Sequence, residues 1–247
     1  MSHRTVLITG AAHGIGRAIS ELFAEHKDSY RIILNYFNSE KEAKDLKREL
    51  LSKGCDAVAI KANVSDFADV QKMITEANKF SSHIDILVNN AGVSFVGLFC
   101  DSSPKDWEKV FSVNVKGMFN CCKAALPGML KRHSGKIINI SSILGLFGAS
   151  LEVVYSASKS AVVGFTKALA KEVGPSGINV NSVAPGLINT KMNNNLTSKE
   201  LENLKIRTPL SRVGTSRDVA NAVFFLASEN SNFITGQTIC VDGGLVV

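Results

Sequence analysis

Short runs of aliphatic residues alternate with longer segments of helical periodicity along the whole chain, and this alternation limits the fold more than any other feature. The strand-like runs are TVLIT, RIILNY, AVAIK, DILVNN, KIINIS, INVNSVA and QTICVD, and the clearest helical segments are 16–26, 39–54, 66–80 and 155–174. Strand-like runs that are apolar almost throughout are typical of a sheet covered on both faces. The sequence therefore predicts an α/β fold in three layers, with a doubly wound parallel sheet.

Composition narrows the class of protein. The 247 residues contain no linker or repeat, which favours a single domain over 1–247. The net charge of +6 is scattered, so we expect no nucleic-acid partner, although an acidic protein partner is possible. The five cysteines form no C-x-x-C pair, which indicates buried free thiols and no metal site. Without a signal-like segment or an apolar stretch of ~20 residues, we expect a cytoplasmic protein that does not enter a membrane.

A glycine-rich segment, TGAAHGIG, follows the first strand-like run and precedes the first helical segment. Gly10, Gly14 and Gly16 permit a sharp turn and a close approach of the backbone to a pyrophosphate, which then meets the N–H groups at the helix start. In a parallel sheet, ligands bind beyond the carboxyl ends of the strands, where this turn is expected. Its position favours a dinucleotide site over a plain strand-to-helix turn.

The end of the second strand-like run bears on the choice of cofactor. An NAD site usually has an acidic side chain there, whereas this chain has Asn35 and Tyr36. A 2′-phosphate would meet no carboxylate, and His13, Ser39 or Lys41 could donate to it. The sequence thus favours NADPH. The alternative is that the end of this strand is merely polar surface and the protein accepts either cofactor.

Tyr155 and Lys159 are four residues apart in a helical segment, so their Cβ atoms are expected on one face about 5–6 Å apart. They follow a strand-like run that ends at Ser141 and Ser142. A phenol with a pKa of ~10 could protonate the oxyanion left by hydride transfer to a ketone, and a neighbouring ammonium would lower that pKa. Ser142 could hold the carbonyl oxygen, while we assign Ser141 to packing. The pattern predicts a ketone reductase.

These motifs together resemble the short-chain dehydrogenase/reductase family: TGAAHGIG, NNAG at 89–92, VNVKG around Asn114, Ser142, YSASK, and PG at 185–186. The resemblance implies a Rossmann-like domain, usually a homotetramer, in which Ser142, Tyr155, Lys159 and Asn114 are catalytic. Tyr155 would be the acid, Lys159 would also hold the nicotinamide ribose, and Asn114 would anchor a water that feeds protons to Lys159. The implied cofactor contacts are Gly10, His13, Gly14, Ile15, Gly16, Asn35, Tyr36, Ser39, Asn63, Val64, Asn90, Ala91, Gly92, Tyr155, Lys159, Pro185, Gly186, Ile188 and Thr190.

Within the family, KIINISS, GFTKALAKE, NSVAPG and ITGQTICVDGG resemble the 3-oxoacyl-[acyl-carrier-protein] reductases of fatty-acid synthesis. That resemblance implies an acidic acyl carrier protein as partner, with the basic run Lys131–Arg132–His133 either as part of its docking patch or as a solvated helix end. Met192 is a candidate apolar contact to the substrate.

Glu152 departs from that pattern, because a carboxylate near the active site suits a substrate with an ammonium group better than a neutral acyl chain. GAS-x-E-V-x-Y-S also resembles reductases of the 5-aminopentanone modification on elongation factor P, which implies that Glu152 contacts the amine; a solvent-facing Glu152 is the alternative. A third alternative is a regulatory protein that binds NADPH without catalysis, which the retained Tyr155 and Lys159 disfavour.

Overall fold

A computed structural model describes residues 3–190 and 198–246. Seven parallel strands form one sheet in the order β3-β2-β1-β4-β5-β6-β7. The strands are β1 (Arg4–Ile8), β2 (Tyr30–Tyr36), β3 (Ala57–Lys61), β4 (Ile86–Asn89), β5 (Gly135–Ile140), β6 (Ile178–Pro185) and β7 (Thr238–Val241). All seven predicted strands are confirmed, and the strand order changes direction between β1 and β4.

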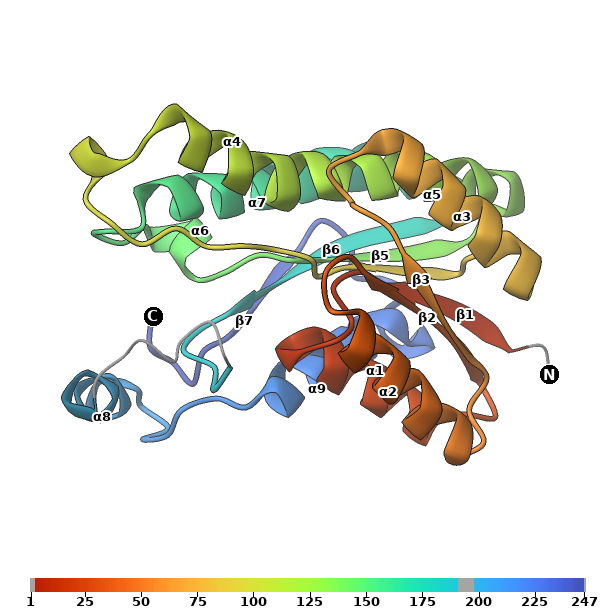
Figure 1. Ribbon diagram of the computed structural model, residues 1–247, viewed down its shortest axis with the longest axis horizontal. Helices are drawn as coiled ribbons and strands as arrows, with labels where there is room; N and C mark the ends of the chain where they lie inside the picture. Colours follow the sequence, from red (N-terminus) through yellow and green to blue (C-terminus); the bar gives the residue numbers. More distant parts are fainter. Residues whose placement is uncertain (1–2, 191–197, 247) are drawn as a thin grey trace.

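Helices cover both faces of the sheet, as the predicted three-layer fold requires (Figure 1). One face carries α1 (Gly14–Glu25), α2 (Glu40–Ser52) and α9 (Ser216–Ala227), and the other carries α3 (Phe67–Ser81), α4 (Pro104–Phe111), α5 (Gly117–Arg132) and α7 (Val153–Val173). Two further helices, α6 (Leu144–Phe147) and α8 (Ser198–Arg207), lie toward the carboxyl ends of the strands. Right-handed crossovers between parallel strands produce this arrangement.

The strands β1 to β6 contribute to two hydrophobic cores because neighbouring residues point to opposite faces. On β1, Ile8 packs in the core beneath α1 and α9, whereas Leu7 packs in the core beneath α3, α5 and α7. On β4, Val88 and Leu87 divide in the same way. This double burial explains why the strands are apolar almost throughout.

The helix starts differ in how they are capped. α4 and α9 begin with complete capping boxes, made by Ser103 with Asp106 and by Thr215 with Asp218. The residues before α1 and α2, His13 and Ser39, make no side-chain capping bond. The first N–H groups of α1 and α2 are therefore not occupied by a capping side chain, and such groups attract anions.

Three further predictions concern composition. In the part of the chain that the structure describes, no cluster of ligating side chains could hold a metal ion, and no helix has the length and apolar character to cross a membrane. All five cysteines are free. Cys55, Cys121 and Cys122 are buried as expected, but Cys100 and Cys240 are exposed, so the prediction of buried thiols is wrong for those two.

Candidate active site

The glycine-rich turn joins β1 to α1 with a backbone that only glycine fits. Gly10 has a φ of +62°, and a Cβ there would lie 3.0 Å from the Cα of Ala91. A Cβ on Gly16 would lie 2.3 Å from the carbonyl oxygen of Gly10. Gly14 also has a positive φ, of +49°. This close packing leaves backbone N–H groups at the start of α1, with Ile15 among the first residues of the helix.

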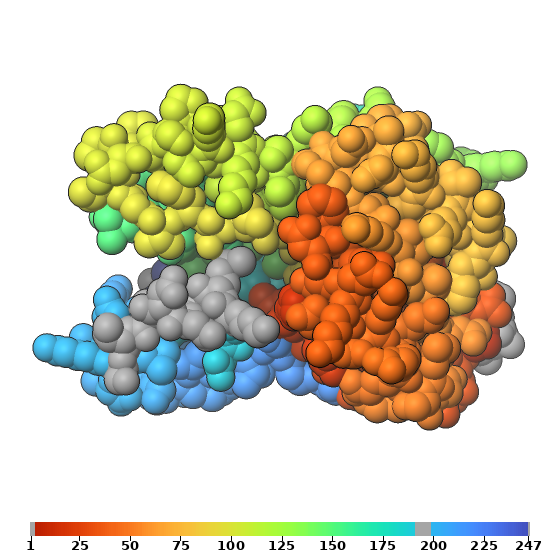
Figure 2. All heavy atoms as spheres, in the orientation of Figure 1, coloured from red at the N-terminus to blue at the C-terminus, as the bar shows by residue number. Residues whose placement is uncertain are grey.

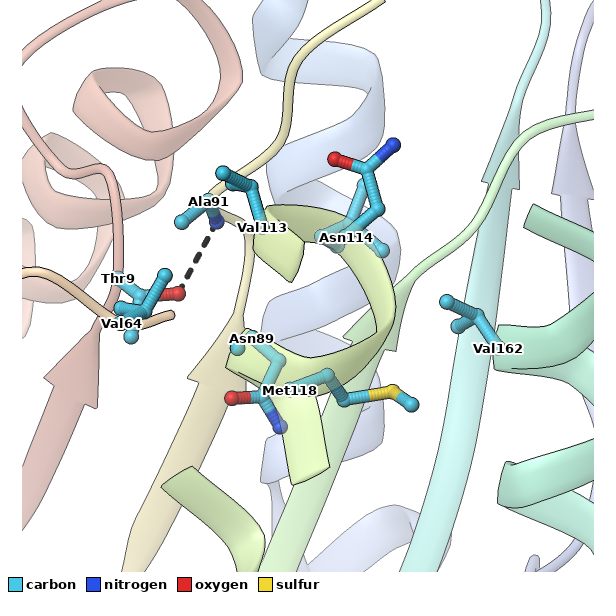
Figure 3. A pocket seen from close by; sticks show the side chains of 10 residues that line it. Thr9, Val64, Asn89, Ala91, Val113, Asn114, Met118 and Val162 are labelled. Atoms are coloured by element: carbon cyan, nitrogen blue, oxygen red, sulfur yellow. Dashed lines mark hydrogen bonds between the residues drawn. The ribbon is translucent and has the colours of Figure 1, made fainter. Parts of the chain in front are cut away.

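The segment after β4 is fixed against this turn by buried hydrogen bonds. The hydroxyl of Thr9 accepts hydrogen bonds from the backbone N–H groups of Asn90 (2.9 Å) and Ala91 (3.0 Å), the second of which is drawn in Figure 3. The Asn90 amide donates in turn to the carbonyl oxygens of Thr9 (2.9 Å) and Gly10 (3.1 Å). Asn90 and Ala91 therefore set the shape of the turn.

Asn35 and Tyr36 lie at the end of β2 but face inward. Asn35 is 2% exposed, and its amide group donates to the carbonyl oxygen of Ala62 (3.1 Å) and accepts from the N–H of Gly10 (3.4 Å). Tyr36 is buried beside Ala12 and Ala43. Asn35 therefore braces the turn from within the fold, and Tyr36 packs beside it.

His13 and Ser39 are brought together from neighbouring helix starts. The Nε2 atom of His13 lies 2.9 Å from the hydroxyl of Ser39. The sequence offered these residues as separate donors to a phosphate, and the fold joins them into one polar pair.

Asn63 and Val64 follow β3. The side-chain oxygen of Asn63 accepts from the N–H (3.1 Å) and hydroxyl (2.8 Å) of Ser65, and the carbonyl of Val64 accepts from the amide of Asn120 (2.8 Å). Val64 also packs against Gly117, where a Cβ would lie 2.7 Å away. Both residues lie at the same edge of the sheet as the glycine-rich turn.

The segment after β6 returns to the start of α1. Gly186 packs so closely on Asp242 that an added Cβ would lie 2.6 Å from the Asp242 side chain, and Ile188 is buried beside Gly214. The methyl group of Thr190 lies 3.4 Å from where a Cβ of Gly14 would stand. Pro185 ends β6, and its carbonyl accepts from the N–H of Ile143 (3.1 Å). Met192 lies outside the described residues.

Lys159 is buried on α7, with 4% of its surface exposed. Its Nζ donates to the carbonyl oxygen of Ile140 at the end of β5 (2.8 Å) and lies 5.7 Å from the centre of the Tyr155 ring. Burial lowers the pKa of Lys159 from 10.5 to about 8. The predicted pairing of Tyr155 and Lys159 on one helix face is present.

The pKa of Tyr155 is shifted upward in this structure, whereas the charge of a neighbouring ammonium is expected to lower it. Burial, followed by the charge of Glu152, raises the pKa of Tyr155 to about 12, and a hydrogen bond with Ser142 opposes the shift. Desolvation disfavours the phenolate more than the serine favours it. Tyr155 is therefore a phenol near neutral pH, the form that can donate a proton.

The two serines after β5 have different surroundings. Ser142 Oγ accepts from the N–H of Leu144 (3.1 Å) and interacts with Tyr155. Ser141 donates to the backbone carbonyl of Lys159 (2.9 Å) and is buried. Ser141 thus packs α7 onto β5, in agreement with its assignment to packing.

Asn114 lies on a π-helical turn, Ser112–Lys116, between α4 and α5. Its amide exchanges two hydrogen bonds with the backbone of Val93 (2.8 and 2.9 Å) and donates to the hydroxyl of Ser158 (3.0 Å). Ser158 donates to the carbonyl of Tyr155 (2.7 Å). π-Helical turns occur often at functional sites. Asn114, Met118 and Val162 line a cavity of about 10 Å³. Figure 3 labels these three side chains around it.

Ser158 is a site residue that the sequence reasoning missed. It links Asn114 to the turn of α7 that carries Tyr155, and the only signal was its place three residues after that tyrosine, on the same helix face. Gly92 lies where these groups meet, since a Cβ there would lie 3.3 Å from the Asn114 side-chain oxygen, a tight contact, and 3.5 Å from Lys159 Nζ.

Glu152 directly precedes α7 and is half-buried, which raises its pKa. The residue before it, Leu151, has a φ of +66°, an unusual conformation for a bulky side chain. The carbonyl of Leu151 accepts from the N–H of Gly97 (2.8 Å), which ties the segment before α7 to the loop after β4. Glu152 is thus held beside Tyr155.

The basic run Lys131–Arg132–His133 lies at the opposite edge of the sheet from Ser142. Arg132 donates to the carbonyl of Ile84 (2.7 Å), just before β4 begins. β5 has six residues, which at roughly 3.3 Å each puts about 20 Å between the two edges. The run therefore lies away from Ser142 of the same chain.

Comparison with known proteins identifies the class that this fold and site define. The family model described as "Enoyl-(Acyl carrier protein) reductase" matches residues 10–246. The chain belongs to the short-chain dehydrogenase/reductase family. Members of this family are oxidoreductases that bind a nicotinamide cofactor.

Curated relatives are similar over nearly the full length. The chain is 42% identical to the 3-oxoacyl-[acyl-carrier-protein] reductase FabG of Staphylococcus aureus, with 98% of each chain covered. It is 40% identical to the 3-oxoacyl-[acyl-carrier-protein] reductase of a Synechocystis species, over 100% of this chain and 98% of the relative. It is 38% identical to the FabG reductase of Thermotoga maritima, over 99% and 98%.

The residues fit a nicotinamide dinucleotide. The glycine-rich turn gives the backbone approach, the start of α1 has no acidic residue in its first turn, and Gly92 leaves space beside Lys159. A reduced nicotinamide supplies a hydride when bound. The chain's own groups would orient a carbonyl oxygen through Ser142, donate a proton to it from the Tyr155 hydroxyl, and offset the charge left on Tyr155 through Lys159.

Proposed function

We propose that this protein reduces the ketone of a 3-oxoacyl thioester carried by an acyl carrier protein to the secondary alcohol, with NADPH as the reductant. The observation that carries the proposal is Tyr155 as a half-buried phenol that interacts with the Ser142 hydroxyl and lies 5.7 Å, from its ring centre, from the Lys159 Nζ atom. The curated names of relatives that cover the whole chain support the substrate class.

The choice of NADPH is supported by the end of β2. No carboxylate follows Tyr36 before Glu40, and Glu40 forms an ion pair with Lys44 (2.6 Å). A 2′-phosphate there would meet His13, Ser39 and Lys41. The proposal also includes a homotetramer and an acidic carrier protein as partner, both of which the family resemblance implies. It further includes a location in the cytoplasm.

The family model and the curated relatives differ in the double bond that their names specify. Enoyl reduction adds a hydride and a proton across C=C, whereas 3-oxo reduction adds them across C=O. A hydroxyl pair such as Ser142 and Tyr155 suits a carbonyl oxygen, which accepts hydrogen bonds, better than an alkene carbon. We therefore favour the ketone.

Glu152 favours a second candidate substrate, a ketone that carries an ammonium group, such as the 5-aminopentanone modification on elongation factor P. Among the described residues, no basic side chain forms an ion pair with Glu152, although it is half-buried beside Tyr155. A partly desolvated carboxylate attracts a cation more strongly than an exposed one does.

The test is NADPH oxidation by the purified protein with acetoacetyl-carrier thioester, a matched enoyl thioester, and an aminopentanone-modified protein. The proposal predicts turnover of the 3-oxo thioester and little of the enoyl thioester. Preference for the enoyl thioester would contradict it. Preference for the aminopentanone substrate, reduced at least tenfold by Glu152→Gln but not by Glu172→Gln at the far end of α7, would favour the second candidate.

A further inference from the structure

We propose that Gly145 is a positioning residue, which sets how closely the segment after β5, with Ser142, approaches the turn of α7 that carries Tyr155 and Lys159. A side chain at position 145 would move Ser142 away from Tyr155. For its effect on turnover the inference rests on the proposed ketone reduction, and it adds a residue that acts through Ser142.

Gly145 is buried in α6, where its backbone lies directly against the backbone of Lys159. A Cβ on Gly145 would lie 2.6 Å from the carbonyl carbon of Lys159, 2.8 Å from its carbonyl oxygen and 2.8 Å from its Cβ. Carbon atoms in contact are about 3.5–4.0 Å apart, so the two segments would have to separate by roughly 1 Å. Backbone atoms cannot rotate out of the way, as the end of a flexible side chain could.

Hydrogen bonds hold this contact in place. The hydroxyl of Ser160, the residue after Lys159, donates to the carbonyl oxygen of Gly145 (2.7 Å). Ser141 Oγ donates to the carbonyl oxygen of Lys159 (2.9 Å), and Lys159 Nζ donates to the carbonyl oxygen of Ile140 (2.8 Å). The chain from the end of β5 to α6 thus contacts one turn of α7 at three positions.

Of the two segments, α6 is the one that would move. α7 has 21 residues, ten of them buried, whereas α6 has four residues, of which only Gly145 is buried. Figure 2 shows the surface hollowed between α4 and α8, where α6 lies in the same view in Figure 1. α6 therefore has less packed around it than α7 has.

Ser142 would move with α6. The N–H of Leu144 donates to Ser142 Oγ (3.1 Å), and the N–H of Gly145 donates to the Ser142 carbonyl oxygen (3.0 Å). A displacement of α6 therefore reaches the hydroxyl that interacts with Tyr155. Misplacement of a group by 1 Å can lower a catalytic rate by about 10²-fold, so the expected effect on turnover is large.

The loss of the contact between Ser142 and Tyr155 should also change the pH dependence. That contact opposes the rise in the pKa of Tyr155, so its loss would raise this pKa further. Oxidation of the alcohol with NADP⁺ needs the phenolate, and the pH at which its rate levels off should move upward. A general loss of stability would not move this pH.

The experiment compares the wild type with Gly145→Ala and with Gly164→Ala as the matched control. Gly164 is exposed on α7, and outside its own part of the helix no atom of the described residues lies within 4 Å of where its Cβ would stand. We expect Gly145→Ala to lower kcat for ketone reduction by about 10–100-fold and to raise the pH at which alcohol oxidation levels off. Gly164→Ala should match the wild type in both.

Ser142→Ala tests the route by which Gly145 acts. In a Ser142→Ala background, Gly145→Ala should lower kcat by no more than about threefold, because the contact through which it acts is already lost. If the two losses multiply instead, the inference is overturned.

A crystal structure of Gly145→Ala gives a readout that needs no ketone. We expect the distance between Ser142 Oγ and Tyr155 Oη to be roughly 1 Å longer than in the wild type, and an unchanged distance would overturn the inference. This result is the same whether or not the protein reduces a 3-oxoacyl thioester, so failure of the proposed function is distinguished from failure of the inference.

A second variant covers the case in which Gly145→Ala does not fold. Ser160→Ala removes the hydrogen bond to the Gly145 carbonyl oxygen without adding an atom. It should lengthen the same distance between Ser142 and Tyr155 and shift the pH profile of alcohol oxidation in the same direction. A distance and a profile identical to those of the wild type would overturn the inference.

Discussion

Two buried lysines at opposite ends of β5 differ in what they do. Lys136, the second residue of the strand, is 5% exposed and donates to the hydroxyl of Ser231 (3.3 Å). Lys159 is 4% exposed and donates to the carbonyl of Ile140, the last residue of the strand (2.8 Å). Burial lowers the pKa of both lysines.

Their neighbours distinguish them. The charge of Glu229 opposes the shift at Lys136, whereas nothing offsets the shift at Lys159, whose pKa falls to about 8. Lys136 lies at the amino edge of the sheet, and Lys159 lies at the carboxyl edge beside Tyr155. Burial alone thus does not indicate that a lysine takes part in catalysis. The better indication is a titratable neighbour at the edge of the sheet where ligands bind.

The largest expected difference between the two lysines is in turnover. Lys159→Met should lower kcat for ketone reduction by roughly 10²–10⁴-fold, because the charge that offsets the Tyr155 phenolate is lost. Lys136→Met should stay within about threefold of the wild type, since Lys136 lies at the amino edge of the sheet, about 13 Å along β5 from Ile140. Steady-state kinetics with both folded variants checks this, and equal losses would remove the distinction.

In stability the same substitution should act in the opposite direction. The folded pKa of Lys159 is about 8 and its unfolded pKa is 10.5, so at pH 7 the protonated lysine is buried at a cost of about 3 kcal/mol. Lys159→Met removes that cost and leaves the Ile140 carbonyl without its donor, for a net gain of roughly 2 kcal/mol. The gain should vanish above about pH 10.5, where both states are neutral.

Denaturant unfolding at pH 7 and pH 10 measures this gain. Lys136→Met should give a smaller gain, because Glu229 already stabilises the ammonium at that position. A loss of stability in Lys159→Met at pH 7 would show that the hydrogen bond to Ile140 outweighs the burial of charge.

Above pH 8 the pH dependence of turnover should follow Lys159. Its proton is lost as the pH rises through about 8, and kcat/KM should then fall by up to about tenfold per unit. Lys159→Arg should move this fall in kcat/KM to higher pH, and Lys136→Met should leave it in place. If Lys136→Met moved it instead, the assignment of the fall to Lys159 would be wrong.

The smallest effect is expected at Glu152. Its charge is the second cause, after burial, of the raised pKa of Tyr155. Glu152→Gln should therefore lower that pKa, shifting the pH at which alcohol oxidation with NADP⁺ levels off by about half a unit downward. Glu172→Gln, the control, should leave the pH profile of alcohol oxidation unchanged. If Glu152→Gln also left that profile unchanged, solvent would screen the Glu152 carboxylate from Tyr155.

The strands could be predicted almost completely from the sequence, because most of them are buried on both faces and are therefore mainly apolar. AVAIK matches β3 residue for residue, and RIILNY misses only Tyr30 at the start of β2. The proximity of Tyr155, Lys159 and Ser142 could also be predicted, since Tyr155 and Lys159 are one helical turn apart and Ser142 follows β5 at the same edge of the sheet.

The rest depends on tertiary structure. Asn35 reads as a surface residue at a strand end, yet it turns inward to bond Ala62 and Gly10. In the sequence, Ser158 is only a small residue in a helical segment. Its link to the site appears in the fold, where the amide of Asn114 on the π-helical turn donates to its hydroxyl. The edge of the sheet on which Arg132 lies follows from the direction of α5, which local sequence does not report.

Tyr155 as the acid of an NADPH-dependent ketone reductase is tested most directly by single-turnover reduction of acetoacetyl-carrier thioester, with wild type and Tyr155→Phe compared at saturating NADPH. The account predicts rapid loss of nicotinamide absorbance in the wild type, and at least a 10²-fold slower rate in a variant that still binds NADPH. Equal rates for the two proteins, or no reduction by the wild type, would contradict it.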